Sequence, residues 1–281
     1  MKTNKPEEIE IIERARTGDR RALESLLTNV QTWIYNVVRR ILLNPQEAED
    51  VTQEVLLKIA TNLSAYDPTR ASFKTWAYRI SINHALNGKR GRLEEITTGF
   101  SDYANELEKM PNIEISANEL SRPENLVLIE EAKASCTLGM LLCLDREQRI
   151  ALILADLMGL SDRESSEILG ISNEAFRKRL SRARKDLYTF MDDKCGLMNE
   201  KNPCRCSKKM KSFQNNGWID PTNPRFSMPL VRRLKEQVAE LHCEFEDFKR
   251  LEYQEIFRDH PYFETPPKIL DELIAKYSPA V

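Results

Sequence analysis

Residues 159–191 read GLSDRESSEILGISNEAFRKRLSRARKDLYTFM, and this stretch predicts two helices joined by a short turn. Ser161 and Glu164 have the spacing of a capping box, which begins the first helix. Gly170 lies in the turn, and Ser172 is placed to cap a second helix that continues to the end of the stretch. Two helices across a tight, glycine-containing turn are the signature of a helix-turn-helix.

The second of these helices has an apolar side and a basic side. Six positive charges and no acid fall within residues 177–185. At about 100° per residue, one arc carries apolar side chains that we expect to face a core, namely Ala175, Phe176, Leu180, Ala183 and Leu187. The candidate DNA-binding residues on the rest of the helix are Glu174, Arg177, Lys178, Ser181, Arg182 and Lys185. Cations neutralise phosphates or bind guanine edges, and an acid can accept from a cytosine amine. A merely solvated basic face is the alternative, but the capped turn and the run of cations favour DNA.

The composition predicts an all-α protein. The 281 residues include 31% charged and 41% apolar side chains but only nine glycines, and the formal net charge is −2. The length allows two modest domains and an appendage. No apolar run is long enough to cross a bilayer, so we expect no membrane contact and a cytoplasmic protein. We also expect no enzyme, because the sequence has no Ser-His-Asp set, HExxH motif or phosphate-binding loop.

The pattern along the chain predicts two helical domains, a linker and an extension. Consecutive helices are expected over residues 7–93. Residues 94–124 lose the helical period, are strongly acidic and contain prolines, which predicts an extended linker. Helices resume over residues 125–191 and include the helix-turn-helix. Residues 192–281 form a C-terminal extension with a long amphipathic helix at about 229–258.

Two stretches of the first domain hold candidate binding residues. In AEDVTQEVLLKI, residues 48–59, the polar side chains Asp50, Gln53 and Glu54 share one face of an expected helix. In YDPTRASFKTWAYR, residues 66–79, we expect a loop followed by a helix, with Phe73 and Trp76 in the core. The polar candidates of this second stretch are Arg70, Ser72, Lys74, Thr75 and Arg79.

The first domain resembles the second conserved region of bacterial RNA polymerase sigma factors, and the helix-turn-helix domain resembles the fourth. Their order, with no third domain between them, is similar to that of the extracytoplasmic-function (ECF) subgroup of the sigma-70 family, over residues 7–191. The resemblance implies a non-enzymatic subunit that binds core RNA polymerase and directs promoter-specific initiation. The alternative is a stand-alone helix-turn-helix regulator of operator DNA, which would have no need of the first domain.

The same resemblance implies a role for each set of candidates. Asp50, Gln53 and Glu54 would dock on the polymerase clamp helices. The stretch at 66–79 would read the promoter −10 element, and the basic helix face would read the −35 element. The linker would pass through the polymerase interior, although a solvated tether is the alternative from composition. An anti-sigma factor would be a further partner.

The extension contains several closely spaced cysteines, and three interpretations of their chemistry are possible. Cys195, Cys204 and Cys206 fall within twelve residues, and Cys243 lies on the expected long helix. Four such ligands could hold Zn²⁺. The neighbouring Arg205, Lys208 and Lys209 would lower the thiol pKa values, which suits a redox switch instead. The third reading is three thiols without a special role.

Overall fold

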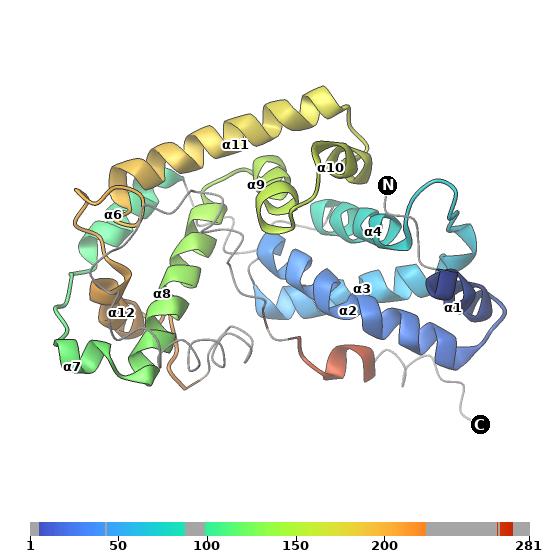
Figure 1. The fold of residues 1–281 in the computed structure, drawn as a ribbon, viewed down its shortest axis with the longest axis horizontal. Coiled ribbons are helices and arrows are strands. Elements are labelled where there is room, and N and C mark those ends of the chain that lie inside the picture. Colours follow the sequence, from blue (N-terminus) through green and yellow to red (C-terminus); the bar gives the residue numbers. More distant parts are fainter. Residues whose placement is uncertain (1–5, 43, 88–98, 223–262, 264, 272–281) are drawn as a thin grey trace. The chain divides into compact units, whose positions relative to one another are not determined.

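The structure is a computed structural model that describes residues 6–42, 44–87, 99–222, 263 and 265–271 (Figure 1). Every named element in these residues is a helix, which confirms the predicted all-α class. Within the same residues, no helix is both long enough and apolar enough to cross a membrane. The chain divides into two compact units, the first made of residues 1–93, 161–176 and 265–281 and the second of residues 94–160 and 177–264.

The first unit is a small helical bundle around one central helix. Helix α2 contacts α1, α3 and α4. The helices of this bundle are α1 (Pro6–Arg16), α2 (Arg20–Leu42), α3 (Pro45–Thr61), the short 3₁₀ helix η1 (Leu63–Ala65) and α4 (Phe73–Asn87). Its core is apolar and fully buried, with Ile34, Val37, Val38 and Ile41 from α2, Val55, Leu56 and Ile59 from α3, and Phe73, Ala77 and Ile82 from α4.

Local sequence signals explain where these helices begin and end. Gly18 has a φ of 94°, a backbone conformation that favours glycine, and it separates α1 from α2. Asn44 caps α3, because its side-chain oxygen accepts from the amides of Gln46 and Glu47. Pro45 then occupies the first turn, where its missing N–H costs nothing.

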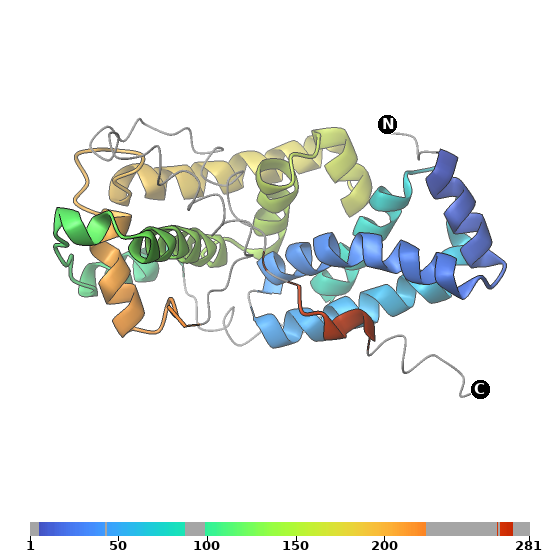
Figure 2. The ribbon, with the colours of Figure 1, turned by 60° about the horizontal axis from the view of Figure 1, so that its bottom comes forward.

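A short C-terminal segment belongs to the first unit as well. Residues 265–271 lie against α2 and α3 (Figure 2). Lys268 forms an ion pair of 3.2 Å with Glu49 on α3, and Gln31 on α2 donates to the carbonyl of Pro266 at 3.5 Å. The amphipathic helix that the sequence predicts at 229–258 lies outside the described residues.

The second unit combines the predicted linker, part of the helix-turn-helix domain and the start of the extension. Helix α12 packs along α8, and α6 and α7 also contact α8 (Figure 1). The helices that lie wholly in this unit are α6 (Phe100–Lys109), α7 (Ala117–Leu120), α8 (Pro123–Leu142), α9 (Arg146–Leu152), the π-helical turn η2 (Ile153–Leu157) and α12 (Cys206–Asn215). Most of α11 (Asn173–Lys194) belongs to this unit too.

The prediction of an extended linker over residues 94–124 is wrong for the larger part of its described residues. Residues 100–109 form α6 and residues 117–120 form α7. The apolar side chains of α6 do follow the helical spacing, but the helix is only ten residues long, and just three of its side chains are buried, namely Tyr103, Ala104 and Leu107. Tertiary packing on α8, rather than local propensity, stabilises such a short helix.

The predicted helix-turn-helix is present. Ser161 and Glu164 form a reciprocal capping box at the start of α10 (Asp162–Leu169). Gly170 ends α10 in the left-handed conformation with a φ of 66°. The Ser172 hydroxyl then accepts from the amide of Ala175 at 3.1 Å and caps α11.

Candidate nucleic-acid and polymerase interfaces

The basic face of α11 is exposed, as the helical period predicts. Phe176, Leu180, Ala183 and Leu187 are buried, and Ala175 is half-buried. All six predicted −35 residues are exposed, namely Glu174, Arg177, Lys178, Ser181, Arg182 and Lys185. A helix with one packed face and one exposed cationic face can enter a groove of DNA while it stays anchored to its own domain.

Two of the six cations at residues 177–185 of α11 form ion pairs within the domain instead. Arg184 binds the carboxylate of Asp156 through two nitrogens, at 2.6 and 3.2 Å, and Asp156 is only 1% exposed. The hydroxyl of Tyr188 donates to the same carboxylate at 3.0 Å. Arg179 pairs with Glu147 on α9 at 3.0 Å. These contacts fix how α11 is rotated, and so decide which cations face outward.

The polar residues predicted to read the −10 element differ in exposure: the cations are exposed and the hydroxyls are half-buried. Arg70, Lys74 and Arg79 are exposed. Ser72 and Thr75 are half-buried and share a hydrogen bond of 2.9 Å, and the amide of Thr75 donates to the Ser72 hydroxyl at 3.2 Å. The Ser72 hydroxyl therefore caps α4 and is held by that of Thr75, while the three cations lie at the surface.

A cluster of three aromatic side chains packs beside this loop. Phe73 is fully buried, as predicted, whereas Trp76 is half-buried. The rings of Tyr66, Phe73 and Trp76 lie 5.4–5.7 Å apart from centroid to centroid. Trp76 therefore reaches the surface beside the polar loop, where a ring face can stack on an unpaired base.

Arg16 of α1 holds the loop in place, which the sequence did not indicate. Its guanidinium donates to the carbonyl of Leu63 at 3.1 Å and also to the carbonyl of Tyr66. On the other side, Arg79 donates to the carbonyl of Glu167, which belongs to the same compact unit. No local pattern connects residues 47 to 88 positions apart, so only the fold reveals these contacts.

The predicted polymerase-binding residues lie on one side of α3. Asp50 and Glu54 are exposed, and Gln53 is half-buried. The carboxylate of Glu54 accepts from Nε2 of His84 at 2.5 Å, and Nδ1 of His84 accepts from Lys58 at 2.6 Å. His84 on α4 therefore bridges Glu54 and Lys58 on α3, and this contact holds the Glu54 carboxylate in place.

The cysteines of the extension form a group with one cysteine of α8. Cys195 and Cys204 face each other in an isolated parallel bridge. Gly196 lies so close to this bridge that a Cβ there would come within 2.1 Å of the carbonyl oxygen of Cys204. Burial raises the pKa of Cys206, and the neighbouring thiols of Cys195, Cys136 and Cys204 raise it further. The sequence offered no sign of Cys136, which lies far from the others along the chain.

The expected lowering of the thiol pKa values is wrong. Burial raises the pKa of Cys195, Cys204 and Cys206 above the ordinary value, and the nearby cations do not reverse it. Arg205 is engaged with the carbonyls of Glu200 and Cys204, at 2.9 and 3.0 Å. Buried thiols with a raised pKa are poor nucleophiles, which disfavours a redox switch.

The described cysteines do not by themselves make a metal centre. Among the described residues, no three His, Cys, Asp or Glu side chains are arranged to hold a metal ion. The predicted fourth ligand, Cys243, lies outside the described residues. Zinc at Cys195, Cys204, Cys206 and Cys243 therefore stays a prediction.

Both domains match known protein families. Residues 26–93 match the family model for sigma-70 region 2, and residues 135–187 match that for sigma-70 region 4. The ECF RNA polymerase sigma-E factor of Escherichia coli is 31% identical over 177 residues, which are 62% of this chain and 89% of that protein. The RNA polymerase sigma-H factor of Pseudomonas aeruginosa is 29% identical over 181 residues, 63% of this chain and 89% of that protein.

A solved structure of the sigma factor CnrH, in complex with the cytosolic domain of CnrY, is also similar. It aligns with a TM-score of 0.46 and 22% identity, and covers 66% of this chain and 97% of that one. The matched regions are those that carry the acidic face of α3, the loop before α4 and the basic face of α11. On the sequence relationship and the two region models, the chain belongs to the ECF subgroup of sigma-70 factors.

Proposed function

We propose that the chain binds core RNA polymerase and directs it to promoters, with α11 at the −35 element and the loop before α4 at the −10 element. The observation that carries this proposal is the division of cations on α11. Arg179 and Arg184 are bonded within the domain, while Arg177, Lys178, Arg182 and Lys185 are exposed on its outer face. Exposed cations beside Ser181 and Glu174 supply both phosphate contacts and base-edge contacts.

The first domain supplies polymerase binding and strand opening in this proposal. Asp50, Gln53 and Glu54 on α3 would bind the polymerase. Arg70, Lys74 and Arg79 would hold the backbone of the opened strand, while Trp76 offers a ring face to a base. A protein that acts in this way works in the cytoplasm and has no catalytic site of its own. An anti-sigma factor that covers these surfaces would be its regulator.

Reconstitution with core polymerase tests the proposal. The full chain and core enzyme together should start transcription at defined promoters, and neither should do so alone. If the isolated chain instead bound duplex operator DNA tightly and with sequence preference, it would act as a stand-alone regulator, and the proposed function would be wrong.

A further inference from the structure

The start of the C-terminal extension presents lysines to the acidic linker. Both segments belong to the second compact unit. Three lysines of the extension form ion pairs with three glutamates of the linker region, and the Nζ–carboxylate distances range from 2.6 to 3.2 Å. The pairs are Lys194–Glu108, Lys208–Glu114 and Lys211–Glu119. Such regular matching of opposite charges between distant segments indicates an interaction surface rather than chance proximity.

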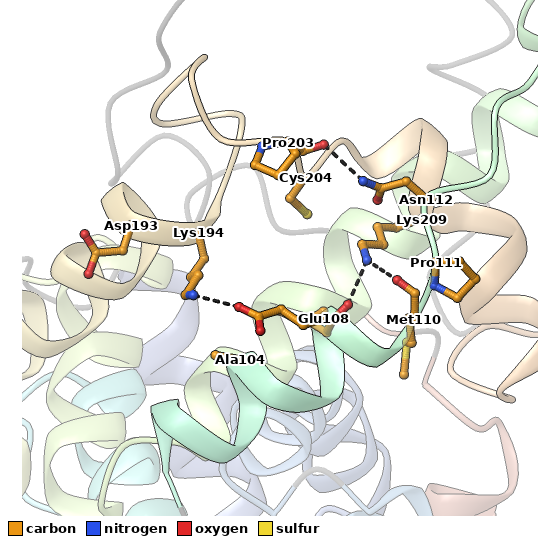
Figure 3. A pocket seen from close by; sticks show the side chains of 11 residues that line it. Ala104, Glu108, Met110, Pro111, Asn112, Asp193, Lys194, Pro203, Cys204 and Lys209 are labelled. Carbon is orange, nitrogen blue, oxygen red and sulfur yellow. Dashed lines mark hydrogen bonds and ion pairs between the residues drawn. The ribbon is translucent and has the colours of Figure 1, made fainter.

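Lys209 is the buried anchor of this surface. It is only 6% exposed, and its ammonium group donates to the carbonyl of Leu107 at 2.7 Å and to that of Met110 (Figure 3). These carbonyls stand at the end of α6, where the backbone acceptors have no partner within the helix. A buried ammonium that satisfies them favours the helix end both by hydrogen bonding and by its charge.

The backbone beyond α6 is bound as well. The amide of Ile113 donates to the carbonyl of Lys208 at 2.9 Å. The hydroxyl of Ser212 donates to the carbonyl of Pro111 at 2.5 Å, and the side-chain amide of Asn112 donates to the carbonyl of Pro203 at 3.4 Å. The first two of these contacts use the linker backbone, so they hold the path of the linker and not merely its charges.

Aromatic packing seats the extension on the same helices. The ring of Trp218 stacks on that of Tyr103 in α6, with 5.8 Å between centroids and 15° between planes. Gly139 of α8 makes room for Tyr103, because a Cβ there would lie 2.5 Å from the tyrosine oxygen. A cavity of about 370 Å³ remains between the linker and the extension, lined by residues of both, Cys204 and Lys209 among them (Figure 3).

We propose that residues 194–219 are an intramolecular clamp that holds linker residues 107–119, and that the clamp must open before the linker can enter polymerase. The inference rests on the proposed function and on the path through the polymerase interior that the family resemblance implies for the linker, since a linker on that path cannot stay folded against its own extension. The closed clamp is then an autoinhibited state. The apparent affinity for polymerase is lowered by the fraction of molecules in which the clamp is closed.

The test begins with amide hydrogen exchange of the full-length protein, without polymerase. Residues 107–114 should be protected in the wild type. Lys209→Met keeps the length of the side chain but removes the buried donors, and it should speed exchange in this segment by about tenfold or more, as expected for a hydrogen bond to a charged group. Lys201→Met is the matched control, because Lys201 is an exposed lysine of the same extension, and it should change nothing.

Reversing the charges of one exposed ion pair provides a second set of variants that does not disturb the core. Lys208 and Glu114 are 37% and 78% exposed in their side chains. Lys208→Glu should speed exchange of the linker by a few-fold, and the double variant Lys208→Glu with Glu114→Lys should restore the wild-type rate. Helical content, measured by circular dichroism, should stay constant across this set.

Measuring the affinity for core polymerase then tests whether the clamp regulates polymerase binding. Lys209→Met and Lys208→Glu should bind core enzyme more tightly than wild type, in proportion to the gain in linker exchange, and the double variant should return to the wild-type affinity. The clamp is refuted if linker residues 107–114 of the wild type exchange like an unfolded peptide. Its regulatory role is refuted if the linker opens while polymerase affinity stays unchanged or falls. Absence of any promoter-directed transcript with wild type would count against the proposed function alone, because the exchange data need no polymerase.

Discussion

Two arginines on α11, two positions apart, have opposite roles. Arg182 is exposed, whereas Arg184 binds the buried carboxylate of Asp156. We expect Arg182→Ala to weaken −35 recognition by roughly 1–3 kcal/mol if the lost contact is to a base, while thermal stability stays unchanged. Binding to core polymerase should also stay unchanged. A loss of stability equal to the loss in promoter binding would contradict this assignment.

Arg184→Ala should show the reverse pattern. Asp156 would keep its bond from Tyr188 but lose its charged partner, and a buried carboxylate without a cation is strongly disfavoured. Because the Arg184 side chain is 34% exposed, we expect a loss of about 2 kcal/mol in the free energy of unfolding rather than the full value for a buried pair. Chemical denaturation measures this, and an unchanged midpoint would show that the pair does not stabilise the domain.

The buried thiols of the extension, and that of Cys143 at the end of α8, should react slowly with alkylating reagents. Burial raises the pKa of Cys195, Cys204 and Cys206, and that of Cys143 to about 12. At neutral pH these groups should be protonated and should react with iodoacetamide at least about tenfold more slowly than in the unfolded chain. Mass spectrometry of the native protein after timed alkylation checks this. Rapid alkylation of Cys204 or Cys206 would instead support the hypothesis of a redox switch.

At the scale of helices, the acidic face of α3 should bind polymerase independently of α11. Asp50→Ala combined with Glu54→Ala should lower the affinity for core enzyme without changing the helical content. Glu24→Ala, an exposed acid on α2, is the matched control and should have no effect. Equal weakening by the control would mean that net charge, rather than this face, drives the association.

Acid should weaken the contact between the linker and the extension. The pKa of Glu108 lies below its ordinary value of 4.5 because Lys194 donates to it, and that of Glu119 is lowered by Ser116 and then by Lys211. A carboxylate whose pKa is lowered by folding adds stability above its unfolded pKa and loses it as the pH falls through the folded value. Linker protection should therefore be constant from pH 8 to about 5 and decline below about 4.5. A decline between pH 8 and 6 would point to another titrating group.

Helix starts, helix stops and the face of α11 could be predicted because their causes are local. Ser161 with Glu164, and Asn44 with Pro45, satisfy helix-end amides within a few residues. Helix α6 and the group around Cys136 could not be predicted in this way. Their stability comes from contacts across many residues, such as that between Tyr103 and Trp218. The basic stretch at 177–185 could be predicted only in part. Its cations are evident from the sequence, but only the contacts to Glu147 and Asp156 in the structure show which of them are structural and which are exposed.

The whole chain should recognise promoters only in its complex with polymerase. The chain carries a net charge of −2, and its acidic segments compete for the cationic faces, so the isolated protein should bind duplex DNA weakly. The most direct measurement is transcription by core polymerase from the promoter upstream of the protein's own coding sequence, with and without the full chain. We predict a transcript with a defined start that requires the chain and is lost in Arg182→Ala. Tight specific DNA binding by the chain alone, with no transcript from the reconstituted enzyme, would show instead that the chain is a stand-alone regulator.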